Sequence, residues 1–195
     1  MKVTLLWHTP HPQQEIARAA GMTRGRPEVE EGANVSEYIR RLIERGHDSV
    51  LEFASAAFLI ERISRACLAQ LTRHRLSSFA VLSHRHVPAA PEFVTPPSIA
   101  ADPELKERFD EAASRCFSLY RELIDRGVRK EDARYVLPQA LATSLIMAAN
   151  FRQWRRILRL RLDPSAQWEI RELCGLILDE LLKIAPAVFE DLREA

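Results

Sequence analysis

The sequence predicts a single α+β domain, because short β-rich runs and long helical patterns share one chain of 195 residues. Residues 2–7 read as a strand, and apolar residues recur at helical spacing over residues 103–126 and 166–184. Neither a repeat nor a low-complexity segment nor a linker divides the chain. We therefore expect one domain spanning residues 1–195.

Composition favours an ordinary globular protein, with 47% apolar and 28% charged residues. The 28 basic and 27 acidic residues nearly cancel, so no global field favours nucleic acid or a membrane as a partner. The apolar run that ends at Trp7 is too short for a signal peptide, and residues 140–149 are too few to cross a bilayer. The chain has three widely spaced cysteines: Cys67, Cys116 and Cys174. We expect them to be buried thiols in a reducing compartment, so we predict a cytoplasmic protein.

The first half of the chain is expected to mix strands with short helices. Apolar residues recur at the helical period after residue 34, which predicts a helix. Asn34 or Ser36 would cap this helix, and Gly46 would end it. Dense apolar residues predict a buried strand at 51–61, although the alanines there leave a helix possible. In order, we expect a strand at 2–7, a helix at 13–20, a loop at 21–33, a helix at about 35–45, the strand at 51–61 and a helix at 64–71.

The second half is expected to be mainly helical. Prolines at 88, 91, 96 and 97 indicate an extended, ordered loop, and Gly127 closes a long amphipathic helix. In order, we expect a strand or turn at 79–82, the loop, helices at 103–126 and 130–137, a strand or helix at 141–150, and helices at 151–161 and 166–184. The last helix should bury one stripe: Ile170, Leu173, Leu176, Ile177 and Leu181.

One segment stands out because it is basic without nearby acid. Residues 62–91 hold five arginines and neither Asp nor Glu, and residues 73–86 hold three of the six histidines. Unpaired guanidinium groups need an anion, which is either a carboxylate elsewhere in the fold or a ligand phosphate. Taken alone, Arg73-His74-Arg75 could be a solvated basic corner, but hydrogen-bonding residues follow it: Ser77, Ser78, Ser83 and Arg85.

A second arginine cluster lies in residues 151–161. Its spacing predicts one helical stripe: Arg152, Arg155, Arg156 and Arg159. Salt bridges to Glu169, Glu172 or the acidic C-terminal helix would explain Arg155 and Arg159. RNA binding is the rival hypothesis, but it needs aromatic residues for base stacking, and few are close in sequence.

Two other chemistries are weakly supported. Ser83 has neighbouring histidines, but adjacent residues rarely form a nucleophile–base pair and the Gly-x-Ser-x-Gly pattern is absent. His84-x-His86 has no nearby Cys or carboxylate that would complete a ligand set. We therefore predict no metal site.

Arg73-His74-Arg75, followed by Ser83-x-Arg85, resembles the signature of the flavin-dependent thymidylate synthases. Other blocks of that family resemble this chain in the same order and spacing: residues 45–52, Gln70, residues 131–138, residues 150–152 and residues 160–171. The resemblance extends over most of the chain, from about Ile16 onward.

The resemblance implies a fold with a central, mostly antiparallel sheet packed with long helices. It also implies reductive methylation of dUMP to dTMP, in which methylenetetrahydrofolate supplies carbon and FAD, reduced by NADPH, carries the hydride. Members are homotetramers whose flavin sites lie between subunits. Nucleic acid and membranes are not expected partners.

Individual roles follow by position from the same resemblance. Arg161 would be catalytic, because it would stabilise an N3-ionised uracil electrostatically. The flavin would be held by Ser49, Glu52, Arg73, His74, Arg75, Asn150, Arg152 and Arg156. The nucleotide would be held by Gln70, Arg73, Ser83, Arg85, Arg134 and Arg161.

Some positions depart from the family pattern. Ala80, Val81 and Leu82 stand where Asn and a polar Glu or Gln are usual. His86 replaces a common Tyr, and Arg156 replaces His or Asn. A divergent flavin- or nucleotide-binding homologue, with another pyrimidine substrate or without methylation, is therefore the alternative hypothesis.

Overall fold

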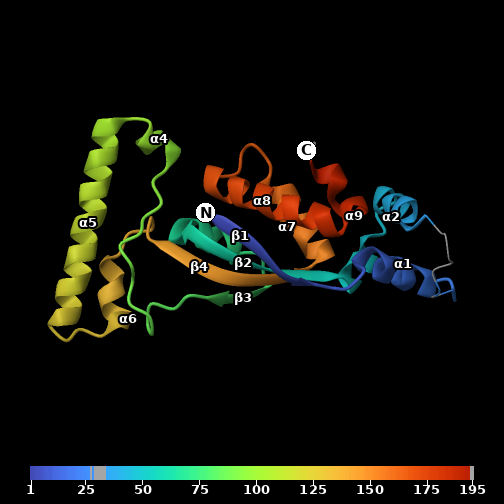
Figure 1. Ribbon diagram of the computed structural model, residues 1–195, viewed down its shortest axis with the longest axis horizontal. Helices are drawn as coiled ribbons and strands as arrows, with labels where there is room; N and C mark the ends of the chain where they lie inside the picture. Colours follow the sequence, from blue (N-terminus) through green and yellow to red (C-terminus); the bar gives the residue numbers. More distant parts are fainter. Residues whose placement is uncertain (27, 29–33, 194–195) are drawn as a thin grey trace. The chain divides into compact units, whose positions relative to one another are not determined.

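The computed structural model describes residues 1–26, 28 and 34–193 and contains a four-stranded sheet in the order β1-β2-β4-β3 (Figure 1). The strands are β1 (Lys2–His8), β2 (Ser55–Ser64), β3 (Ser78–Val81) and β4 (Ala142–Asn150). The α-helices are α1 (Pro12–Met22), α2 (Val35–Glu44), α3 (Arg65–Leu71), α4 (Pro97–Ala100), α5 (Pro103–Asp125), α6 (Lys130–Ala133), α7 (Phe151–Arg161), α8 (Trp168–Ile184) and α9 (Pro186–Phe189). Short 3₁₀ turns are η1 (Asp48–Phe53), η2 (Arg134–Val136) and η3 (Glu190–Leu192).

Backbone hydrogen bonds show that the strands run antiparallel. They join the end of one strand to the start of its neighbour: Thr9 N to Ser55 O at 3.0 Å, Phe151 N to Ala54 O at 2.8 Å, and Leu82 N to Ser144 O at 2.9 Å. The predicted α+β class with a mostly antiparallel sheet is confirmed.

Side-chain caps fix where several helices begin, and the sequence predicted the cap at Asn34. Asn34 accepts a hydrogen bond from Glu37 N (3.1 Å), and Ser64 accepts one from Cys67 N (2.9 Å). Asn150 does the same for α7. Each cap satisfies a backbone N–H that the first turn of a helix leaves without a partner.

Several expected boundaries were wrong. The sequence predicted a strand from residue 51, but β2 begins at Ser55. The preceding residues form the 3₁₀ turn η1, which buries Val50 and Leu51, and Ala54 after it is also buried. The helix predicted over 130–137 ends at Ala133 and continues as η2. α1 extends to Met22, into the expected loop, of which residues 27 and 29–33 lie outside the described residues.

Contacts between Cα atoms divide the chain into two compact units. Unit 1 comprises residues 1–60, 73–79 and 146–195, and unit 2 comprises residues 61–72 and 80–145. Strands β2, β3 and β4 contribute residues to both units. The expectation of a single domain remains a prediction, and the two units are described separately below.

In unit 1, α7 and α8 pack beside each other against the sheet (Figure 1). Trp154 of α7 meets Phe58 of β2 edge to face, with ring centroids 5.2 Å apart, and donates its Nε1–H to Ala56 O at 3.1 Å. The inward stripe of α8 is buried as predicted, except that Leu176 is 37% exposed because it lies at the margin of that stripe.

Unit 2 has a smaller core around α5, which packs against α6 (Figure 1). Tyr120 is buried, and its hydroxyl accepts a hydrogen bond from Ala89 N at 3.2 Å, which ties the proline-rich loop to the helix. Phe93 pairs with Leu141 in an isolated bridge, so the loop is ordered as predicted, although α4 interrupts it from Pro97. Within the described residues, no helix is long and apolar enough to cross a membrane.

Candidate functional site

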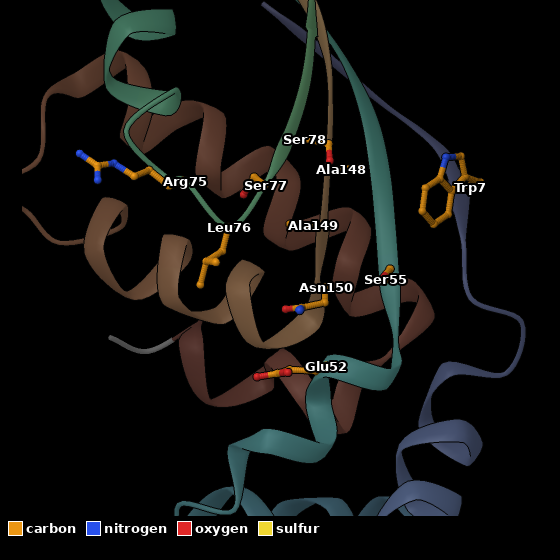
Figure 2. Close-up of a pocket in the computed structure, with 10 residues that line it drawn as sticks. All are labelled: Trp7, Glu52, Ser55, Arg75, Leu76, Ser77, Ser78, Ala148, Ala149 and Asn150. Carbon is orange, nitrogen blue, oxygen red and sulfur yellow. The ribbon is translucent and has the colours of Figure 1, made fainter.

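Unit 1 contains a pocket of about 530 Å³ where the inner strands meet the chain that follows α3 (Figure 2). This volume falls in the range of small-molecule sites, roughly 300–1,000 Å³. Ten residues line it: Trp7, Glu52, Ser55, Arg75, Leu76, Ser77, Ser78, Ala148, Ala149 and Asn150.

The pocket combines hydroxyl, amide and carboxylate groups with two small alanines. Asn150 accepts from Gln153 N at 2.8 Å through Oδ1, so its side-chain NH₂ is the part that can donate to a ligand. Ser77 Oγ is buried without a hydrogen-bond partner among the described residues. This hydroxyl can therefore bond to a ligand that enters the pocket. Glu52 accepts from Arg152 Nη1 at 2.6 Å, in an exposed pair beside the pocket.

Arg73 and Arg75 are exposed and form no salt bridge within the described part of the chain. Figure 2 shows Arg75 extending away from Leu76, Asn150 and Glu52. The first explanation of the acid-free segment, a carboxylate elsewhere in the fold, therefore does not apply to these two side chains. Both cations are available to an anionic ligand.

His74, between those two arginines, is buried and only 7% exposed. Arg161 Nε, at the end of α7, donates to His74 Nε2 at 3.1 Å. Burial lowers the pKa of His74, and the positive charges of Arg161 and Arg156 lower it further. Burial raises the pKa of the Cys174 thiol, which the charge of Arg161 also reaches, to about 12.

The other residues predicted to hold a nucleotide belong to unit 2. Arg134 Nε donates to Glu131 O at 3.0 Å, and Arg85 faces the Glu131 carboxylate at 3.4 Å in an exposed pair. Ser83 Oγ accepts from Arg85 N at 3.4 Å, and Gln70 is half-buried at the end of α3. Unit 2 thus holds Gln70, Ser83, Arg85 and Arg134, whereas Arg73 and Arg161 belong to unit 1.

Arg65 is a cation of unit 2 that the sequence did not single out. Burial lowers the pKa of Arg65, and the charge of Arg134 lowers it further, so the two guanidinium groups are close enough to repel. Among the described residues, Arg65 forms no salt bridge. His84, nearby, is 3% exposed and faces Val87 O through Nδ1 at 3.3 Å.

The predicted arginine stripe on α7 is only partly correct. Arg155 is 2% exposed, points inward and donates to both carboxylate oxygens of Asp191 at 2.6 Å. Arg159 lies 3.7 Å from the same carboxylate, so the salt-bridge explanation for Arg155 and Arg159 is confirmed. The other three arginines of the stripe stay exposed on one face of α7, but Arg152 pairs with Glu52 and Arg159 with Asp191. This pairing weakens the observation behind the RNA-binding hypothesis.

Three of the predicted flavin residues line the pocket: Glu52, Arg75 and Asn150. A fourth, Arg152, does not line it but donates a hydrogen bond to Glu52. Ser49 is exposed on η1, and Arg156 is exposed on α7. The sequence did not single out Trp7, Ser55, Ala148 and Ala149, which line the pocket. They come from strands whose pairing is not visible in a single sequence. Within the described residues, no group of three His, Cys, Asp or Glu side chains could hold a metal ion.

In this antiparallel α+β fold, arginines that form no salt bridge within the described residues lie beside a hydroxyl-lined pocket, an arrangement suited to a large anionic ligand. A family model described as thymidylate synthase complementing protein matches residues 4–187. The chain is 39% identical to the flavin-dependent thymidylate synthase of Pyrococcus furiosus, over 94% of this chain and 80% of the relative. It is 38% identical to that of Geobacter sulfurreducens, over 98% and 86%. The chain belongs to the flavin-dependent thymidylate synthase family.

Proposed function

We propose that the protein makes dTMP from dUMP by reductive methylation. Methylenetetrahydrofolate is the carbon donor, and FAD, reduced by NADPH, is the hydride donor. The observation that carries this proposal is the hydrogen bond from Arg161 to buried His74, beside two arginines without salt bridges. It brings together the predicted catalytic arginine and the predicted flavin segment within unit 1.

The pocket of unit 1 fits part of a flavin nucleotide. Ser77 Oγ and the Asn150 amide offer hydrogen bonds, and the alanines of β4 leave room for a flat ring or a ribose. Arg73 and Arg75 supply the positive charge that a pyrophosphate needs. The proposed flavin residues remain Ser49, Glu52, Arg73, His74, Arg75, Asn150, Arg152 and Arg156.

The nucleotide would be held mainly by arginines. Arg85 and Arg134 are suited to the phosphate, because guanidinium groups bind phosphate oxygens in pairs. Gln70, Ser83, Arg73 and Arg161 complete the proposed set. Arg85 now faces Glu131 in an exposed ion pair, which contributes little free energy. Arg85 could therefore leave Glu131 and bind a dianionic ligand at little cost in free energy.

Bound FAD supplies the hydride chemistry that the side chains of this chain cannot provide. The task of Arg161 is electrostatic. Its guanidinium would stabilise negative charge that develops on the uracil ring when N3 is ionised. Because His74 fixes Arg161 Nε before substrate arrives, little reorganisation is needed during the reaction.

The test is product formation with single omissions. The full chain with FAD, NADPH, methylenetetrahydrofolate and dUMP should give dTMP, detected by mass spectrometry. Omitting any one component should abolish the product. Arg161→Ala should also abolish it while leaving the circular dichroism spectrum unchanged, since Arg161 is half-exposed. No dTMP from a folded, flavin-loaded protein would refute the proposal.

A second candidate function is favoured by the apolar end of β3. Ala80 is exposed and Val81 half-buried, so neither offers a hydrogen bond where the family usually has polar groups. A homologue that acts on another pyrimidine nucleotide would bind FAD tightly but make no dTMP from dUMP. Several pyrimidine monophosphates can be screened for their ability to enhance oxidation of the reduced flavin. Enhancement by a nucleotide other than dUMP would favour this candidate, and enhancement by dUMP would favour the first.

We also propose a cytoplasmic homotetramer. The support within the chain is the apolar stripe of α5, where Leu105 is 48% exposed and Leu119 is 44% exposed. Light scattering after size exclusion should give four times the chain mass of 22.3 kDa. A monomeric mass at micromolar concentration would contradict this assembly.

A further inference from the structure

His74 is one of the proposed flavin residues, and its position gives it a second task. Its ring is buried, and its Nε2 accepts the Nε–H of Arg161 at 3.1 Å. We propose that His74 is a positioning residue that must stay neutral to hold Arg161. This inference rests on the proposed catalytic role of Arg161.

The hydrogen bond determines which protonation state of His74 can work. Because Nε2 accepts a hydrogen bond, the neutral imidazole must carry its proton on Nδ1. A protonated imidazolium would present two N–H donors, and its Nε2–H would face the N–H of a positively charged guanidinium. Protonation would therefore break the contact and push Arg161 away.

The charges around His74 favour the neutral form. Arg161 and Arg156, both on α7, are the charges that act on His74. Its neighbours on the same segment, Arg73 and Arg75, are also cationic. Of the residues of α8, which packs against α7, Cys174 stays neutral and Glu169 is buried.

This arrangement gives Arg156 a role. Its guanidinium adds a permanent positive charge that acts on His74. Arg156 is exposed and forms no salt bridge within the described part of the chain, so its charge is not cancelled nearby. By lowering the pKa of His74, this charge widens the pH range over which Arg161 is held.

The first experiment is an NMR titration of the histidine side chains in the full-length protein. We expect His74 to show the Nδ1–H tautomer and to titrate below its ordinary value of 6.5. Arg156→Gln should raise the pKa of His74. Arg159→Gln is the matched control on the same helix, and it should leave that pKa unchanged because Arg159 faces Asp191. An Nε2–H tautomer, or equal effects of the two variants, would overturn the inference.

The second experiment separates positioning from structure. His74→Ala should lower kcat on the order of 10- to 100-fold with little change in KM for dUMP, because Arg161 acts on charge that develops during the reaction. His74→Gln, whose Oε1 can accept from Arg161 Nε, should restore kcat to within about threefold of wild type. The acid limb of kcat should move to higher pH in Arg156→Gln and disappear in His74→Gln.

Failure of these tests is distinguishable from failure of the proposed function. The titration needs neither flavin nor turnover, so it remains valid for an inactive protein. If His74→Gln is as impaired as His74→Ala although both variants fold, the positioning role is wrong even when wild type makes dTMP. If wild type makes no dTMP, the proposed function is wrong, and the titration alone decides whether His74 is held neutral.

Discussion

At the scale of single residues, Arg155 shows how burial separates neighbouring arginines into different roles. Arg155 and Arg156 are adjacent on α7, yet one is 2% exposed and the other is exposed. The buried guanidinium is stabilised by the carboxylate of Asp191 and by Val188 O. A buried charge without such partners would be strongly unfavourable. Arg155 is therefore a structural residue, whereas Arg156 remains available to the site.

Asp191 gives a pH-dependent prediction of stability. Burial raises the pKa of Asp191, but the hydrogen bonds from Arg155 and the charges of Arg155 and Arg159 outweigh burial and lower its pKa below 3.8. A lowered carboxyl pKa means that this stabilisation is present above pH 3.8 and is lost as pH falls through the folded value.

Asp191→Asn should lower the free energy of unfolding at pH 7 by about 1–2 kcal/mol, a range reduced because Asp191 is partly exposed. Urea unfolding at a series of pH values checks this. The difference between variant and wild type should shrink below pH 3.8. A difference that does not change with pH would contradict the pairing.

The cysteines give a prediction about reactivity. Cys67 and Cys174 are buried, and burial raises the pKa of the Cys174 thiol to about 12, whereas Cys116 is partly exposed. Since the thiolate is the reactive form, iodoacetamide at pH 8 should modify Cys116 first in the native protein. Peptide mass spectrometry measures this, and full labelling in urea is the control. Rapid native labelling of Cys174 would show that the core of unit 1 opens.

At the scale of elements, Asn150 has two tasks that can be tested separately. Its Oδ1 caps α7 through Gln153 N, and its amide lies in the pocket lining. Asn150→Ala should cost about 1 kcal/mol of stability by removing the cap. Asn150→Asp keeps an acceptor for the cap but loses the NH₂ donor.

We therefore expect Asn150→Asp to match wild type in thermal unfolding while binding FAD more weakly, as measured by flavin release during dialysis. Asn150→Ala should be impaired in both measurements. Equal FAD affinity in wild type and Asn150→Asp would mean that the amide donor does not reach the flavin.

Local sequence signals predicted many elements because they act within one helical turn. Asn34 caps α2 as expected, and helical periodicity predicted the long helices α5 and α8. The caps at Ser64 and Asn150 were not predicted. The 3₁₀ turn at Leu51 was missed, because short apolar runs read equally well as strands.

The candidate site was predictable only in part. The residue types of Arg73, Arg75 and Arg161 indicated anion binding, and resemblance supplied their roles. The contacts of His74 with Arg161 and of Arg155 with Asp191 join residues 87 and 36 positions apart. Such pairings depend on how the elements fold together and leave no local pattern. Trp7 in the pocket was missed for the same reason.

At the scale of the whole molecule, the nearly balanced net charge conceals a local separation of charge. The formal charge is +1, yet residues 62–91 contain arginines without any acid. Many of the carboxylates elsewhere form ion pairs on the surface, for example Glu37 with Arg41 and Glu122 with Arg126. Within the described residues, three arginines of this segment form no salt bridge, Arg65, Arg73 and Arg75, whereas Arg62 pairs with Glu92 and Arg85 with Glu131. The three cations agree with a protein that binds polyanionic cofactors and substrates.

The visible absorption spectrum of the purified full-length protein tests the central claim most directly. The account predicts a yellow protein, either as isolated or after incubation with FAD, whose flavin absorption is bleached by NADPH without oxygen. Adding dUMP with methylenetetrahydrofolate should then restore the oxidised flavin band as dTMP forms. A folded but colourless protein that takes up no FAD would contradict the account.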